Sequence, residues 1–159
     1  MFGFFKRNKK QMVFSPVDGN IVEIENVPDE VFSQKLAGDG IAILPISSTF
    51  SAPISGMITK IFSTNHAFSI RGNNGIEVLV HIGLDTVELK GEGFKRLVEE
   101  GDKVHSGKPI IYVDLAFLES KGKNLITPII VTSEKKIQLE KHKIGTIREG
   151  ESLMEIQFL

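Results

Sequence analysis

The chain has 159 residues, enough for one domain with a buried core. Its hydrophobic fraction of 41% and charged fraction of 25% are ordinary for a globular domain. Because cysteine is absent, disulfide bonds, thiolate catalysis and cysteine-ligated zinc or iron–sulfur centres are excluded. No apolar run approaches the roughly 18 residues that a membrane-spanning helix needs, and the N-terminus lacks a signal-peptide pattern. We therefore expect a cytoplasmic protein.

Charge is distributed unevenly along the chain. Residues 1–10 hold four basic side chains and no acid, so the remaining residues carry 15 basic and 20 acidic side chains. A mildly acidic body disfavours nucleic acid and favours basic protein partners. We expect residues 1–12 to form a flexible basic and aromatic tail. The competing interpretation is a weak membrane-surface contact through residues 1–10.

The remaining residues favour an all-β fold. Strand patterns recur at short intervals, with Gly, Pro, Asn and Asp between them, which predicts an antiparallel sandwich or barrel. A few short helical turns are predicted, because proline and acidic residues open one segment and a glycine directly follows each of two others. These predicted turns cover residues 28–36, 94–100 and 115–121.

The sequence repeats itself weakly. Residues 15–24, SPVDGNIVEI, resemble residues 52–61, APISGMITKI, with Pro, Gly and two Ile in common. Residues 104–111 resemble 147–154 in the same way, although glycine-containing hairpins can also agree by chance. The simplest account is a strand–turn–strand unit used twice in one sandwich. No linker is evident, so we expect a single domain over residues 13–159.

Two histidines stand among apolar residues. Side chains alternate between the faces of a strand, so the pattern over residues 76–82 places Glu77, Leu79 and His81 opposite an apolar core face. The same alternation over residues 62–70 groups Phe62, Thr64, His66, Phe68 and Ile70 on one face. If the two strands pair, both imidazoles lie in an exposed apolar patch, a feature typical of an interaction site.

Other interpretations of these histidines remain open at this point. Both could be solvated surface residues. Two His with Asp85 could also bind zinc, as in peptidases built on duplicated β-folds. Those enzymes add a His-x-His motif, which this sequence lacks, because His105 and His142 stand alone in polar segments and are expected at the surface.

A longer pattern around both histidines is more specific. Residues 80–94, VHIGLDTVELKGEGF, resemble the signature of glucose-type enzyme IIA of the bacterial phosphoenolpyruvate:sugar phosphotransferase system. Residues 64–70, TNHAFSI, match its second histidine motif, and residues 27–32 with 38–40 match a third segment. The resemblance covers roughly residues 13–159. It implies a β-sandwich of the duplicated hybrid type, with a single enzyme IIA domain.

The resemblance also implies the roles of the two histidines. His81 would accept a phosphoryl group on Nε2 from the phosphohistidine of HPr and pass it to a cysteine of the IIB domain of a sugar permease. His66 would stabilise that group, and the Thr64 hydroxyl would donate to its oxygens. Backbone carbonyls in the turn from Gly83 to Asp85 are expected to accept from both imidazoles. No cofactor is required.

A docking surface is expected around these groups. Asp29 and Asp85 would pair with arginines of HPr and IIB, while the alternative is that they are ordinary solvated acids, with Asp29 starting a helix. The apolar part of the surface is predicted to consist of Val31, Phe32, Leu36, Phe62, Phe68, Leu79 and Val87. We expect one or two of these seven to be buried.

Further expectations concern the organisation of the protein, its alternative function, zinc and the sugar. The chain starts at a Met and shows no permease segment, which suggests a free-standing enzyme IIA, expected to be a monomer. The alternative function is a regulatory binding module that acts on other permeases or kinases through the same face. Zinc is expected only as an intermolecular site, in which His66 and His81 join a partner's carboxylate. Glucose, glucosides and N-acetylglucosamine are all compatible sugars.

Overall fold

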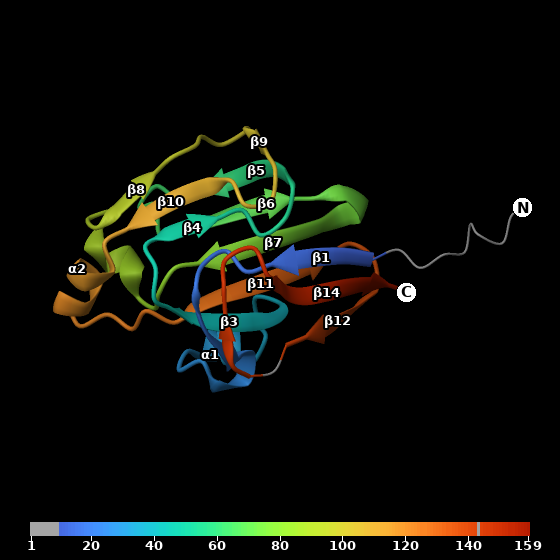
Figure 1. Ribbon diagram of the computed structural model, residues 1–159, viewed down its shortest axis with the longest axis horizontal. Helices are drawn as coiled ribbons and strands as arrows, with labels where there is room; N and C mark the ends of the chain where they lie inside the picture. The colour runs from blue at the N-terminus through green and yellow to red at the C-terminus, as the bar shows by residue number, and fades with distance from the viewer. Residues whose placement is uncertain (1–9, 143) are drawn as a thin grey trace, which may run out of the picture.

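The computed structural model describes residues 10–142 and 144–159. They fold around one eight-stranded sheet, whose strands can be followed in Figure 1. The strand order is β13-β2-β3-β11-β7-β6-β5-β9, and neighbouring strands are antiparallel. In this order the strands are Thr146–Ile147, Gly19–Glu23, Asp39–Pro45, Thr127–Ser133, Ile76–His81, Ala67–Arg71, Gly56–Ile61 and Lys103–Val104.

Two three-stranded sheets complete the β-structure. The first has the order β1-β14-β12, with the strands Lys10–Phe14, Ser152–Phe158 and Ile137–Lys141. The second has the order β4-β10-β8, with the strands Thr49–Ser51, Pro109–Val113 and Phe94–Arg96. The helical segments are short: α1 (Glu30–Ser33), α2 (Leu115–Ser120) and the 3₁₀ turns η2 (Ile24–Asn26), η3 (Asn73–Gly75) and η4 (Thr86–Leu89). The prediction of an all-β fold with a few helical turns is confirmed.

Side chains of all three sheets meet in one hydrophobic core. In β7, Ile76, Val78 and Val80 are fully buried, whereas Leu79 and His81 on the opposite face are half-buried, as the alternation predicts. A second, smaller apolar cluster lies around Ile24, Phe32, Ala42 and Ile130, with Leu79 packed against it. The outward face of β7 is therefore covered in part by η2 and α1, and the end that carries His81 lies beside this cover.

The internal repeat corresponds to two equivalent halves. Gly19 of β2 pairs with Ile147, and Gly56 of β5 pairs with Val104. The backbone N–H of Gly150 donates to the Ser15 carbonyl at 2.9 Å, and the N–H of Gly107 donates to the Ala52 carbonyl at 2.8 Å. The same hydrogen bonds thus recur in both halves, which confirms the duplicated sandwich.

Three predicted boundaries are wrong. Residues 10–12 belong to β1 and pair with β14, so the tail expected over residues 1–12 overlaps the sheet. Residues 1–9, and the membrane contact considered for them, lie outside the described part of the chain. The predicted helix over 94–100 begins as strand β8, because Phe94 enters the core and its strand pairs with β10. The predicted strand over 62–70 is interrupted by a turn between β5 and β6.

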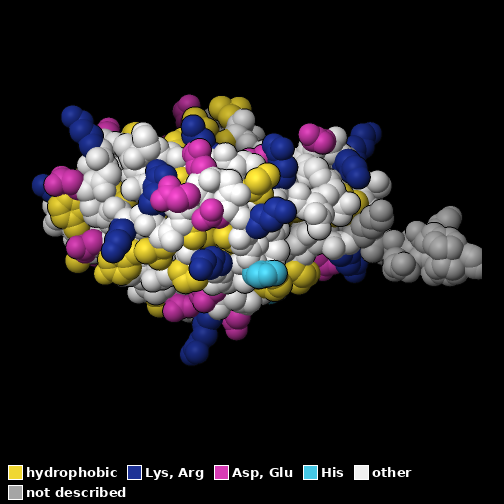
Figure 2. All heavy atoms as spheres, turned by 90° about the horizontal axis from the view of Figure 1, so that it is seen from above, with side chains coloured by type: hydrophobic (Ala, Val, Ile, Leu, Met, Phe, Trp, Pro, Cys, Tyr) yellow, Lys and Arg dark blue, Asp and Glu magenta, His cyan; other side chains and the backbone are white. Residues whose placement is uncertain are grey.

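The two remaining helix predictions are confirmed. Residues 28–36 contain α1, and residues 115–121 contain α2, after which Gly122 adopts a φ of 74°. Among the described residues, the helices are too short and too polar to cross a membrane. On the face seen in Figure 2, basic and acidic side chains are interspersed, with small apolar areas between them.

Candidate active site at the paired histidines

The two histidines predicted to act together lie side by side. His81 ends β7, and His66 immediately precedes the neighbouring strand β6. The backbone N–H of Ile82 donates to the His66 carbonyl at 2.8 Å, which extends the pairing of the two strands to the histidines. The imidazole centroids are 4.9 Å apart, with an angle of 80° between the ring planes. The structure therefore brings both rings into one site, as the resemblance implies.

The imidazole of His81 is oriented by a backbone carbonyl. Its Nδ1 lies 2.8 Å from the carbonyl oxygen of Gly83. A carbonyl can only accept, so Nδ1 carries the proton, and in the neutral ring Nε2 keeps its lone pair. The predicted role of a carbonyl in the turn from Gly83 to Asp85 is confirmed for this histidine.

The loop after β7 holds that carbonyl in place. Gly83 has a φ of 76°, and a Cβ at this position would lie 2.7 Å from Cγ2 of Thr86. The buried hydroxyl of Thr86 donates to the Ile82 carbonyl at 2.6 Å, and the N–H of Leu84 donates to the Asn124 carbonyl at 2.9 Å. Thr86 was not predicted from the sequence as a residue of this site. The signal available was its position inside the motif over residues 80–94.

His66 is held differently from His81. Its Nδ1 lies 2.5 Å from the Thr64 hydroxyl, so the expectation of a carbonyl partner is wrong for this ring. The Thr64 hydroxyl, which was expected to donate to a phosphoryl oxygen, has His66 as its partner instead. The reason is the turn before β6, in which Asn65 adopts a left-handed φ of 59° and directs Thr64 back toward the imidazole. His66 is only 4% exposed, so the expectation that this ring lies in an exposed apolar patch is wrong.

Both imidazoles favour the neutral form. Burial, together with the nearby His81, lowers the pKa of His66 from 6.5 to about 4. Burial also lowers the pKa of His81, while the Gly83 carbonyl and the negative charges of Asp29 and Asp85 oppose this shift. A neutral imidazole is the form that can act as a nucleophile, so the environment of His81 suits nucleophilic chemistry near neutral pH.

A hollow of about 350 Å³ opens in front of His81. Six residues predicted as partner-binding or supporting line it: Asp29, Val31, Phe32, Leu79, Asp85 and Val87. Ala37 and Thr86 also line it and were not predicted from the sequence. Val31 and Val87 are about half exposed, at 49% and 52%. An apolar hollow with two carboxylates at its rim and an imidazole at its base is suited to a basic protein partner.

The predicted docking residues divide into two groups. Phe68 is fully buried in the main core, so its assignment to the docking surface is wrong: it pairs with Val80 and shares the inner face of the sheet. Phe32 is also buried, with its ring 5.1 Å from that of His81. Two of the seven are thus buried, as expected. Phe62 packs edge-on to His66 at 5.3 Å, and Leu36 is 70% exposed outside the hollow.

Asp29 has a structural role as well as its place at the rim. Its side chain accepts a hydrogen bond from the N–H of Val31 at 2.9 Å and so caps α1, which confirms the predicted helix start. Asp85 is exposed and adopts a left-handed φ of 58° at the start of η4. Asp85 also lines the hollow in front of His81.

Few side chains at this site could bind a metal ion without a partner protein. In the described ranges, no group of three or more His, Asp or Glu is arranged to hold a metal ion. Each imidazole uses Nδ1 in a hydrogen bond, so only the two Nε2 atoms remain as ligands. Zinc would need a ligand from a partner, and the intermolecular site stays a prediction. His105 and His142 are exposed, as expected.

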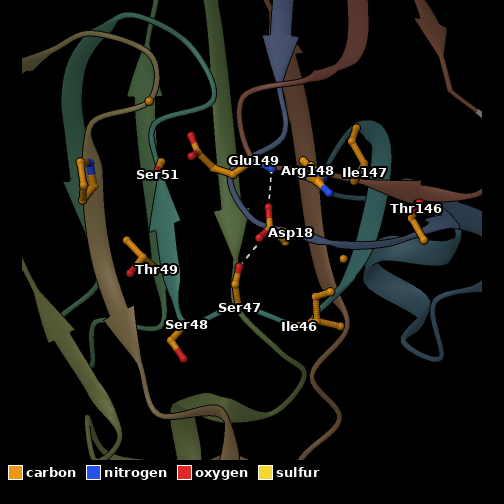
Figure 3. A pocket seen from close by; sticks show the side chains of 13 residues that line it. Asp18, Ile46, Ser47, Ser48, Thr49, Ser51, Thr146, Ile147, Arg148 and Glu149 are labelled. Carbon is orange, nitrogen blue, oxygen red and sulfur yellow. Dashed lines mark hydrogen bonds between the residues drawn. The ribbon is translucent and has the colours of Figure 1, made fainter.

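A second, larger hollow lies away from the histidines. It has a volume of about 870 Å³ and contains none of the predicted site residues (Figure 3). Its polar groups serve turns: Asp18 accepts from the N–H of Glu149 at 2.7 Å, and the N–H of Asp18 donates to the Ser47 hydroxyl at 3.1 Å. The equivalent turn in the other half uses the Ser55 hydroxyl and the N–H of Ser106, at 2.9 Å. These contacts belong to the duplicated fold.

Known proteins resemble this chain over nearly its whole length. Residues 11–137 match the family described as phosphoenolpyruvate-dependent sugar phosphotransferase system, EIIA 1. The glucose-specific EIIA component of Haemophilus influenzae is 48% identical over 151 residues, covering 94% of this chain and 91% of that protein. The glucose permease IIA structure from Mycoplasma capricolum aligns with a TM-score of 0.89 and 40% identity, covering 98% of this chain and 99% of that one.

A third relative carries a similar sequence within a longer protein. The N-acetylglucosamine-specific EIICBA component of Klebsiella pneumoniae is 48% identical over 123 residues, which cover 77% of this chain but 19% of that protein. With the fold, the paired histidines and these similarities together, the chain belongs to the EIIA family of the phosphoenolpyruvate-dependent sugar phosphotransferase system, as a phosphotransferase component that carries phosphoryl groups in sugar transport.

Proposed function

We propose that His81 is the phosphoryl acceptor. Nε2 of His81 attacks the phosphorus of the phosphohistidine of HPr, the N–P bond of HPr breaks, and its electron pair returns to the imidazole of HPr. The observation that carries this proposal is the hydrogen bond of 2.8 Å between Nδ1 of His81 and the Gly83 carbonyl. It places the proton on Nδ1 and leaves the lone pair on Nε2.

His66 stabilises the transferred group in this proposal. When the Thr64 hydroxyl donates to Nδ1 of His66, the proton of the neutral ring resides on Nε2. That N–H can donate to a phosphoryl oxygen on His81, whose ring centroid is 4.9 Å away. The low pKa of His66, about 4, keeps the ring neutral with this single donor at physiological pH.

The second step passes the phosphoryl group to a cysteine of the IIB domain of a glucose-type sugar permease. The sulfur forms a bond to phosphorus while the N–P bond of His81 breaks, and Nε2 regains its lone pair. Two relatives named as EIICBA components, specific for N-acetylglucosamine and for glucosides, carry the matching region within one chain, which supports a permease as the partner. The relatives named as glucose-specific favour glucose as the sugar.

Both partners would use the hollow in front of His81. Its apolar lining and the carboxylates of Asp29 and Asp85 suit proteins that present basic side chains around a reactive group. The alternative role, regulation of other permeases or kinases by the same cytoplasmic protein, would use the same face.

Phosphorylation by the upstream proteins tests the proposal. Incubation with phosphoenolpyruvate, enzyme I and HPr, followed by intact mass measurement, should show the gain of one acid-labile phosphoryl group. His81→Gln should gain none, and His66→Gln should accept the group but pass it to a IIB domain slowly. His105→Gln, which removes an exposed imidazole, is the matched control and should behave as the unmodified protein does. Phosphorylation of His81→Gln would contradict the assignment.

A further inference from the structure

The turn between β5 and β6 presents both Thr64 and His66. It is closed by the N–H of Asn65, which donates to the Phe62 carbonyl at 2.7 Å, and Asn65 adopts a left-handed φ of 59°. Asparagine tolerates this conformation better than most residues do. The path of the backbone through this turn decides where the Thr64 hydroxyl and the His66 ring point.

An arginine from a different sheet forms hydrogen bonds to the same turn. Arg96 is the last residue of β8, and its Nε donates to Oδ1 of Asn65 at 2.7 Å. Its Nη2 donates to the Phe62 carbonyl at 3.4 Å. The guanidinium thus contacts the first and fourth residues of the turn, and its third nitrogen, Nη1, lies 3.4 Å from Oε1 of Glu99.

We propose that Arg96 is a positioning residue for phosphoryl transfer, which holds the turn of Phe62 to Asn65 so that Thr64 and His66 stay aligned with the phosphoryl group on His81. The inference rests on the proposed function, because it assigns Arg96 a task only if His66 stabilises that group. Arg96 touches neither imidazole, so it acts through Asn65 and Phe62.

The chemistry of arginine fits this task. Its planar guanidinium has donors in fixed directions and can hold two acceptors at once, whereas a lysine ammonium at the same position provides a single point of attachment. The chain before β8 also passes near this turn, because a Cβ at Gly91 would be 3.8 Å from the Thr64 carbonyl oxygen. The chain that follows His81 therefore returns to the turn that carries His66, and Arg96 is the residue that bonds to it.

Two substitutions remove the hydrogen bond between Arg96 and Asn65, one at the donor and one at the acceptor. Arg96→Met removes the donors, and Asn65→Gly keeps a residue that adopts a positive φ while it removes the acceptor. We expect either variant to accept the phosphoryl group from phospho-HPr at close to the normal rate, but to pass it to a glucose-specific IIB domain roughly tenfold more slowly, since a displaced group loses much of its positioning effect. Arg96→Lys should resemble Arg96→Met.

A double variant tests whether the two residues act together. If Arg96 works through Asn65, Arg96→Met with Asn65→Gly should transfer no more slowly than either single variant. Arg71→Met and Glu99→Gln are the matched controls, because one removes another surface arginine and the other removes only the exposed partner of Arg96. Both controls should transfer at the normal rate.

The pKa of His66 is a second readout, which a loss of stability alone would not change. In folded Arg96→Met or Asn65→Gly, NMR titration should show the pKa of His66 rising from about 4 toward 6.5, because a loosened turn admits water to the ring. Unchanged transfer and an unchanged His66 titration in both variants would overturn the inference. Failure of the unsubstituted protein to gain a phosphoryl group would overturn the proposed function itself, and the inference with it.

Discussion

His81 and His66 are oriented by different groups, and this difference separates their chemistry. The hydrogen bond to the Gly83 carbonyl keeps the proton of His81 on Nδ1, whereas the Thr64 hydroxyl can donate to Nδ1 of His66. One ring thereby exposes a lone pair on Nε2 and the other an N–H, which is the complementary pair that a phosphoryl transfer site needs. In the proposed transfer, the roles of nucleophile and donor are therefore set by the hydrogen bond that each ring makes through Nδ1.

The buried His66 should make the fold sensitive to acid. Its pKa is about 4 in the folded protein and 6.5 as the ordinary value, so between these values the unfolded chain binds a proton that the folded chain does not. Stability is therefore fully present above pH 6.5 and falls as the pH drops through this window. The loss amounts to about 3 kcal/mol at pH 4.

Urea unfolding of His66→Gln between pH 7 and pH 4 measures this contribution. Relative to the unsubstituted protein, the variant should gain about 3 kcal/mol across this range, because glutamine does not titrate. His105→Gln, at an exposed position, should follow the unsubstituted protein throughout. Parallel curves for His66→Gln and the unsubstituted protein would refute this account of the acid sensitivity.

At the scale of the element, α1 is a helix too short to be stable alone. Its four residues depend on the buried ring of Phe32 and on the cap that Asp29 provides to the N–H of Val31. The helix in turn places Phe32 against the His81 ring and Val31 in the hollow. Asp29 thus has two separable properties, its cap and its charge.

Two substitutions of Asp29 separate these properties. Asp29→Asn retains the cap and should leave the free energy of unfolding nearly unchanged, whereas Asp29→Ala should lose about 1 kcal/mol. If the charge steers HPr, both variants should be phosphorylated more slowly at low ionic strength and to the same degree. Phosphorylation of Asp29→Asn at the normal rate would assign Asp29 to the cap alone.

The turn before β6 shows where strand alternation fails as a guide. The pattern over residues 62–70 predicts Phe62, His66 and Phe68 on one face, and this would hold for a continuous strand. Asn65 turns the chain at a positive φ, so the count of alternating residues restarts at Ala67. As a result Phe68 faces the core beside Val80, and His66 reaches its partner from the turn.

At the scale of the molecule, the duplication places a glycine at the same contact in each half. A Cβ at Gly19 would lie 2.3 Å from the Leu44 carbonyl oxygen, and a Cβ at Gly56 would lie 2.0 Å from the Arg71 carbonyl oxygen. Both contacts are with backbone, which cannot move aside as the end of a side chain can. The glycines therefore permit the close approach of strands in both halves.

Alanine at either glycine should destabilise the fold to a similar extent. Gly19→Ala and Gly56→Ala force backbone apart in a packed sheet, with an expected loss of about 1–3 kcal/mol each in the free energy of unfolding. Denaturant unfolding of both variants measures the loss. Two unequal losses, with one variant as stable as the unsubstituted protein, would show that the two halves do not share this constraint.

The sequence by itself determined the all-β class, the repeat, the outward direction of His81 and the family, because these depend on local alternation and on long contiguous motifs. Only the tertiary structure decided that Phe68 is core, that His66 is buried with a low pKa, and that Arg96 grips Asn65. Each of these depends on which residues distant in sequence become neighbours, and on one left-handed residue that shifts the register. The alternation of a single strand carries neither piece of information.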